Sequence, residues 1–162
     1  MSRLDSVIRR LQAQRACLDR AAALIEAVPG VVLELGLGNG RTYDHLRERL
    51  PGREIFVFDR QVAAHPDSTP DADHLVLGSF DETLPNAKDR FAGQVALVHA
   101  DIGSGHAERD AETAAFIARH LPDWLAPGAI VAGDQAMAIA GAEDLALPDG
   151  VNPGRYFLYR KL

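Results

Sequence analysis

Short apolar segments that alternate with helical ones constrain the fold of this chain more than any other feature. We expect helices at residues 41–50, 81–91 and 107–124. Nearly unbroken apolar strands are typical of a sheet buried on both faces. The alternation therefore predicts an α/β fold, a doubly wound parallel sheet with helices on both faces. The expected strands cover residues 31–35, 55–58, 75–77, 95–99, 129–132 and 156–159.

An amphipathic helix is expected before the first strand, over residues 3–28, with Pro29 and Gly30 ending it. Its apolar residues recur at three- and four-residue spacing. The stripe predicts a helix that covers the chain's own sheet, with a subunit interface in a homodimer or higher homo-oligomer as the second interpretation. No linker or repeat divides the chain, so one domain is expected over residues 1–162. The stripe consists of Leu4, Ile8, Leu11, Leu18, Ala22 and Ile25.

Charge and composition narrow the classes of partner. The formal net charge is −6, which disfavours a phosphate backbone, so we expect no nucleic-acid partner. No apolar run approaches the roughly 20 residues of a membrane helix, and no signal peptide is recognisable. Cys17 is the one cysteine and excludes an internal disulfide. The sequence predicts a cytoplasmic protein without a membrane partner.

The most informative motif is a glycine-rich turn directly after the first strand. Gly36, Gly38 and Gly40 let the backbone approach a ligand closely, and the following helix presents free N–H groups to it. Glu34 precedes the turn and suits a ligand ammonium. Asp59 ends the next strand, 21 residues after Gly38, where an acid can accept both hydroxyls of a ribose. The spacing differs from the G-x-G-x-x-G fingerprint of dinucleotide binding.

The segment 31–40, together with Asp59, resembles the first two signature regions of class I S-adenosylmethionine-dependent methyltransferases. Residues 78–85, 97–101 and 125–131 are similar to the third, fourth and fifth regions, although Ser79 stands where an aspartate is common. The resemblance implies a Rossmann-like, mostly parallel sheet with an antiparallel C-terminal strand, reduced to a minimal core. It also implies S-adenosyl-L-methionine as cofactor and S-adenosyl-L-homocysteine as product.

The resemblance also assigns roles to residues. Glu34 would hold the methionine end directly or through water, and Asp59 would hold the ribose. Adenine would have Arg60 or Gln61 on one side. Ser79 and Phe80 would lie on the other. The full set expected at the cofactor is Glu34, Gly36, Gly38, Asn39, Gly40, Thr42, Asp59, Arg60, Gln61, Gly78, Ser79, Phe80, Asp101 and Ile102.

Methyl transfer is an in-line displacement that requires positioning and exclusion of water more than side-chain chemistry. A base can assist a hydroxyl or amine acceptor, and the candidates are Asp101 and His106. His99, inside a strand, is interpreted as a hydrogen-bonded core residue. Asp101 with Asp134 and the following glutamine is similar to the metal ligands of catechol-type O-methyltransferases, but a glutamine replaces the asparagine. We therefore expect no metal.

The nature of the methyl acceptor follows from what the chain lacks. No lid or substrate domain is recognisable, and residues 135–155 leave room only for a short or altered sixth strand. The Asn/Asp-Pro-Pro-Tyr/Phe motif of base-methylating relatives is absent after the fourth strand. A small-molecule acceptor is therefore predicted. The alternatives are a non-catalytic module that binds S-adenosylmethionine and a nicotinamide-dependent oxidoreductase.

Overall fold

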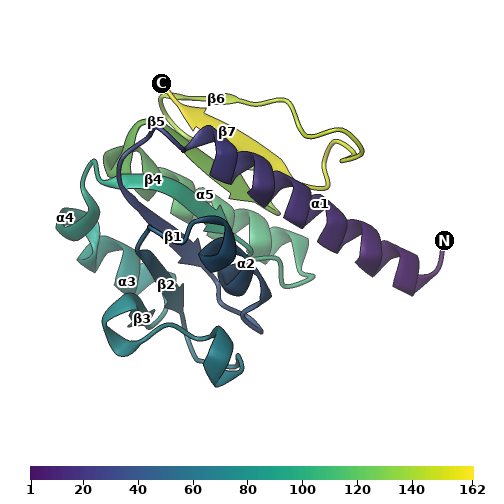
Figure 1. Ribbon diagram of the computed structural model, residues 1–162, viewed down its shortest axis with the longest axis horizontal. Helices are drawn as coiled ribbons and strands as arrows, with labels where there is room; N and C mark the ends of the chain where they lie inside the picture. The colour runs from purple at the N-terminus through teal and green to yellow at the C-terminus, as the bar shows by residue number, and fades with distance from the viewer.

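A seven-stranded sheet in the order β3-β2-β1-β4-β5-β7-β6 forms the centre of the protein (Figure 1). The computed structural model describes all of residues 1–162. The first five strands are parallel, β7 runs antiparallel to β5, and β6 runs antiparallel to β7. The strands are β1 (Val31–Leu35), β2 (Ile55–Asp59), β3 (Leu75–Leu77), β4 (Val95–Ala100), β5 (Leu125–Gly133), β6 (Ala142–Asp144) and β7 (Phe157–Lys161).

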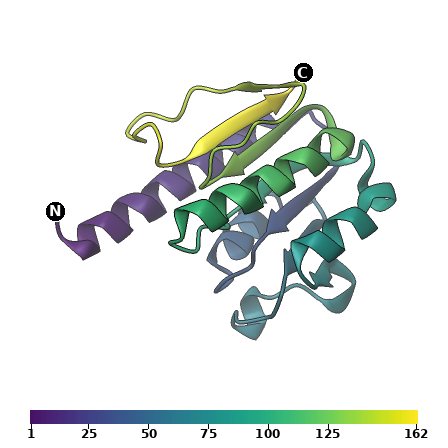
Figure 2. The ribbon, with the colours of Figure 1, turned by 180° about the vertical axis from the view of Figure 1, so that it is seen from behind.

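Helices cover both faces of the sheet, as the alternating pattern predicts. One apolar cluster packs α1 and α2 on one face, and a second packs α3, α4 and α5 on the other (Figures 1 and 2). Successive strand residues point to opposite faces; Val32 therefore joins the first cluster, whereas Leu33 joins the second. The helices are α1 (Arg3–Leu24), α2 (Arg41–Arg49), α3 (Phe80–Asn86), α4 (Lys88–Phe91) and α5 (Ala107–Trp124), with two 3₁₀ turns at Pro66–Ser68 and Ala72–His74.

The predicted doubly wound α/β fold, mostly parallel with an antiparallel strand near the C-terminus, is confirmed. The first helix ends at Leu24 rather than at residue 28. The guanidinium of Arg53 explains the difference, because it donates hydrogen bonds to the carbonyls of Ile25 and Val28, both at 2.6 Å. Those carbonyls are thereby satisfied without a further helical turn.

Further boundaries differ from the prediction, since β5 begins at Leu125 rather than at residue 129 and β7 covers Phe157–Lys161 rather than residues 156–159. The helix expected over residues 81–91 is two helices, which meet at Ala87. Ala87 donates its N–H to the Thr83 carbonyl at 3.0 Å and closes α3 there. In residues 134–141 the chain makes no helix before β6, which spans only Ala142–Asp144. The expectation of a short sixth strand is therefore confirmed.

The two halves of α1 have different environments. The C-terminal half packs on the sheet, and Cys17 and Leu18 are fully buried there. The N-terminal half extends past the sheet (Figures 1 and 2), and its Leu4, Val7 and Ile8 side chains are exposed. The stripe thus covers the sheet along the C-terminal half of α1, and its N-terminal part is exposed. None of the helices has the length and apolar character needed to cross a bilayer.

Candidate active site

A cavity of about 790 Å³ opens at the carboxyl edge of the parallel strands. This is the edge at which open α/β sheets bind their ligands. Four segments contribute to its wall: the glycine turn after β1 and the segments that follow β2, β3 and β4. One face of α5 completes it, with residues spaced at three and four along the helix. The wall of the cavity includes Gly36, Gly38, Asp59, Arg60, Gly78, Phe80, Asp81, Asp101, Ile102, Gly103, Ser104, Arg109, Thr113 and Phe116.

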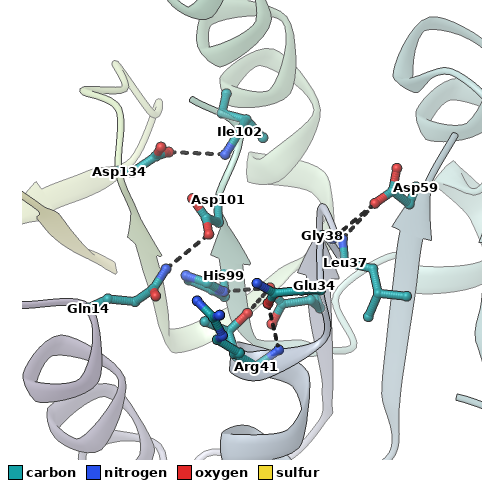
Figure 3. A network of polar contacts seen from close by, with 12 residues as sticks. Gln14, Glu34, Leu37, Gly38, Arg41, Asp59, His99, Asp101, Ile102 and Asp134 are labelled. Atoms are coloured by element: carbon teal, nitrogen blue, oxygen red, sulfur yellow. Dashed lines mark hydrogen bonds and ion pairs between the residues drawn. The ribbon is translucent and has the colours of Figure 1, made fainter. Parts of the chain in front are cut away.

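The glycine turn is folded tightly over the end of β2. Gly36 has a φ of +95° and Gly38 a φ of +53°. A Cβ on Gly36 would lie 2.6 Å from the carbonyl oxygen of Asp101, whereas a Cβ on Gly38 would meet no atom within 4 Å. One oxygen of Asp59 accepts the backbone N–H groups of Leu37 at 2.8 Å and Gly38 at 3.3 Å (Figure 3). Gly36 thus allows the close packing of two loops, and Gly38 leaves open space beside the cavity.

Beneath the turn, the side chain of Glu34 is fully buried. Its Oε1 accepts a hydrogen bond from Thr42 Oγ1 at 3.0 Å and pairs with His99 Nδ1 at 2.7 Å (Figure 3). The other ring nitrogen of His99 is hydrogen bonded to the hydroxyl of Tyr156, which is also buried. Glu34 Oε2 has no hydrogen-bond partner in the protein. A buried carboxylate oxygen in this state is costly, so it marks a place where a further donor is needed.

Two ionisable groups of this network have shifted pKa values. Burial alone would lower the pKa of His99, but the charge and hydrogen bond of Glu34 outweigh it and the pKa is raised. Burial also raises the pKa of Tyr156 well above its ordinary value. Tyr156 is therefore a neutral hydroxyl at physiological pH, and the charge of Glu34 favours the imidazolium form of His99.

Asp101 and Asp134 lie at the ends of neighbouring strands. Gln14 of α1 donates a hydrogen bond to Asp101 Oδ2 at 3.0 Å. Asp134 accepts the backbone N–H group of Ile102 at 3.1 Å (Figure 3). It also accepts that of Gly103 at 2.8 Å, and the two bonds hold the loop after β4. Burial raises the pKa of Asp134, and the nearby Asp101 charge raises it further. Nowhere do three or more His, Cys, Asp or Glu side chains form a group suited to a metal ion.

The structure brings together eight of the residues expected at the cofactor. Those that line the cavity are Gly36, Gly38, Asp59, Arg60, Gly78, Phe80, Asp101 and Ile102. The others lie outside its lining: Glu34, Asn39, Gly40, Thr42, Gln61 and Ser79.

The two candidate bases differ in position. Asp101 is part of the cavity wall, whereas His106 is not. His106 is exposed and occupies the N-cap position of α5, where its side chain makes no hydrogen bond to the helix. His99 is a hydrogen-bonded core residue, as the sequence predicts.

Sequence reasoning missed several residues of the site. Gln14 and Tyr156 come from segments far from the motifs, and α5 contributes a wall that includes Arg109 and Phe116. One signal was available for Gln14: it is a polar residue between Leu11 and Leu18 of the apolar stripe. A polar residue at such a position is buried only when it is hydrogen bonded.

Comparison with known proteins agrees with this geometry. The model of a family described as S-adenosyl-L-methionine methyltransferase matches residues 1–161. The chain belongs to this methyltransferase family. A crystal structure of an S-adenosyl-L-methionine methyl transferase from Silicibacter pomeroyi DSS-3 is 47% identical, covers 99% of each chain and superposes with a TM-score of 0.93. No curated protein matches the chain significantly.

More distant methyltransferase structures share the fold alone. TrmN from Thermus thermophilus is 17% identical with a TM-score of 0.60, covering 90% of this chain and 48% of that one. The antibiotic-resistance methyltransferase Kmr is 12% identical with a TM-score of 0.53, covering 90% of this chain and 93% of that one. Because the chain belongs to a methyltransferase family, a methyltransferase is favoured over the nicotinamide-dependent oxidoreductase that the sequence left as an alternative.

The residues of this methyltransferase fit its cofactor. S-adenosyl-L-methionine supplies a methyl group bound to a sulfonium cation, and it carries an ammonium group. Glu34 does not line the cavity, but its buried charge, with Oε2 unpartnered, lies beneath the glycine turn and favours a cationic group nearby. The open space beside Gly38 lets a ligand approach the backbone. Oxygens of Asp59 retain accepting capacity for ribose hydroxyls, because a carboxylate offers about four lone-pair sites.

Proposed function

We propose that this methyltransferase acts on a small molecule bound in the cavity at the carboxyl edge of the sheet. The observation that carries the proposal is the cavity itself. Its volume of about 790 Å³ lies within the range of roughly 300–1,000 Å³ of small-molecule sites. Its wall extends from the glycine turn along α5 to Arg109, Thr113 and Phe116, beyond the residues expected at the cofactor. That extension gives an acceptor its own contacts.

The proposed cofactor contacts follow the positions of the side chains. Asp59 accepts the ribose hydroxyls, and Phe80 with Arg60 flanks the adenine ring. Glu34, buried beneath the glycine turn, attracts the ammonium group through its charge without lining the cavity itself. Asp101, at the end of β4, lies beside the sulfonium and the acceptor. Because all these elements end at one edge of the sheet, the two substrates are held side by side.

Catalysis in this proposal depends mainly on alignment. The loop after β4 is fixed by Asp134, so Asp101 and Ile102 present a defined wall to the reacting groups. Where the acceptor is a hydroxyl or an amine, Asp101 accepts its proton. We place Asp101 in this role ahead of His106, because only Asp101 lines the cavity.

Calorimetric titration with S-adenosylhomocysteine, with NAD as control, tests the cofactor site. We expect saturable binding of S-adenosylhomocysteine alone. Asp59→Ala should weaken it at least about tenfold, since hydrogen bonds to a charged group contribute roughly 1.5–3 kcal/mol. Asp149→Ala removes an exposed acid far along the chain and should leave it unchanged.

A labelling experiment tests the class of acceptor. The protein is incubated with S-adenosylmethionine labelled in its methyl group and with separated small-molecule, nucleic-acid and protein fractions of a bacterial extract. We expect label in the small-molecule fraction. Label confined to nucleic acid or protein refutes the proposed acceptor class, and binding without transfer to any fraction favours a non-catalytic module.

A further inference from the structure

A continuous chain of polar contacts crosses the protein beneath the cavity. It begins at Glu34 on β1 and passes through His99 on β4 to the hydroxyl of Tyr156. Gln14 of α1 continues it, because its Nε2 lies 3.4 Å from the Tyr156 hydroxyl and 3.0 Å from Asp101 Oδ2. The first four members are at least 95% buried, and only Asp101 reaches the cavity. The chain thus ends on the acid beside the proposed reaction site.

The contacts fix which group Gln14 presents to Asp101. The Glu34 carboxylate only accepts, so Nδ1 of His99 carries a proton. In the imidazolium form that Glu34 favours, Nε2 donates to the Tyr156 oxygen, which keeps a second lone pair to accept from Gln14. Both N–H groups of the Gln14 amide are then used, one on Tyr156 and one on Asp101. An ionised Asp101 suits this arrangement, because it too only accepts.

Gln14 is also the one side chain that donates a hydrogen bond to the Asp101 carboxylate. Figure 3 shows the Gln14 amide reaching from α1 to Asp101, on the opposite side of the site from Asp59. The Gln14 side chain is itself 5% exposed and lies in the half of α1 that packs on the sheet. Its position is therefore fixed by packing as well as by Tyr156.

We propose that Gln14 is a positioning residue that holds the Asp101 carboxylate toward the sulfonium of bound S-adenosylmethionine. The inference rests on the proposed function, in which Asp101 lies beside that cation. It assigns to α1 a part in the site in addition to covering the sheet. A carboxylate held in place favours the cationic cofactor over its neutral product, since S-adenosylhomocysteine carries a thioether instead of the sulfonium.

Calorimetric dissociation constants for S-adenosylmethionine and S-adenosylhomocysteine test this role, because their ratio isolates the sulfonium charge. We expect Gln14→Leu to shift the ratio against S-adenosylmethionine by about tenfold, as the loss of a hydrogen bond to a charged group implies. Asp101→Asn should shift it in the same direction. The double variant should add little to Asp101→Asn, because the two residues act as one unit.

Two further variants separate positioning from a structural role. Gln12→Leu makes the same change at an exposed site on the same helix and should leave both constants unchanged. Gln14→Glu keeps the size of the side chain but turns a donor toward Asp101 into a second acid, so it should disturb the ratio as well. Thermal melting confirms that each variant is folded.

The outcomes distinguish the inference from the function on which it rests. An equal weakening of both ligands by Gln14→Leu, or an unchanged ratio, overturns the positioning role while cofactor binding stands. A ratio that responds to Asp101→Asn but not to either Gln14 variant does the same. Failure of the unaltered protein to bind either ligand overturns the proposed function, and the inference with it.

Discussion

Alanine at Gly36 should mainly cost stability and alanine at Gly38 mainly ligand affinity, although the two glycines belong to one turn. At Gly36 the φ of +95° lies outside the left-handed region that alanine visits. The added methyl would also lie 2.6 Å from the backbone oxygen of Asp101, which is held in place by the sheet. Strain and clash together should cost about 3 kcal/mol or more.

Alanine at Gly38 should cause less backbone strain than at Gly36 and no steric clash. Its φ of +53° is in the left-handed region, where a non-glycine residue costs roughly 1–2 kcal/mol. No protein atom lies within 4 Å of the added methyl, and Gly38 lines the cavity. The methyl should therefore leave the fold nearly intact and occupy space needed by the cofactor.

Scanning calorimetry and ligand titration measure the two effects separately. One kcal/mol corresponds to about 2–4 °C in Tm for a chain of this size, so Gly36→Ala should lower Tm by roughly 6–12 °C and Gly38→Ala by about 2–8 °C. Gly38→Ala should nevertheless bind S-adenosylhomocysteine at least about tenfold more weakly, as expected when a close approach is blocked. A Gly36→Ala protein with the unaltered Tm, or a Gly38→Ala protein with unaltered affinity, would show that the steric argument is wrong.

Three further outcomes are expected from side chains. Trp124→Ala removes the largest fully buried side chain and should lower the free energy of unfolding by about 3–5 kcal/mol in urea titrations; a loss below 1 kcal/mol would contradict its place in the core. The side-chain hydrogen bond from Ser104 lowers the pKa of Asp110. Asp110→Asn should therefore lower the free energy of unfolding at pH values above the ordinary pKa of 3.8, and this loss should vanish as the pH falls through the lowered pKa. A loss that grows in acid would contradict the reasoning. Burial raises the pKa of Cys17 to about 11, so an aromatic disulfide should label it at pH 8 only after unfolding, and rapid labelling of the native protein would show that the helix opens readily.

The sequence predicted the parallel strands well because each of them contains a local apolar run. Residues 31–35 were expected as a strand, and β1 spans Val31–Leu35. Helix 107–124 was also expected with the bounds of α5. The errors fall where tertiary contacts decide the local structure. At residues 25–28 the helix does not continue, because the guanidinium of Arg53, at least 25 residues further along the chain, donates hydrogen bonds to two of the carbonyls.

The site was less accessible to the same reasoning. The glycine turn with Gly36 and the acid at the end of β2 can be recognised in the sequence, because unusual φ values and strand ends leave a local sequence pattern. The partners of Asp101 and His99 are not visible, since Gln14 is 87 residues from the first and Tyr156 is 57 residues from the second. Only a packed sheet brings such segments together, and no local spacing encodes their meeting.

The strand order also bears on how the protein is made. β6 is paired only with β7, and β7 lies between β6 and β5 in the sheet. On the ribosome β6 emerges first and has no neighbour to join until β7 has been synthesised and inserted. During that interval β5 presents an unpaired edge, which is a template for association with other chains. Nascent chains of this methyltransferase should therefore be prone to association at this stage and benefit from chaperone binding until β7 is in place.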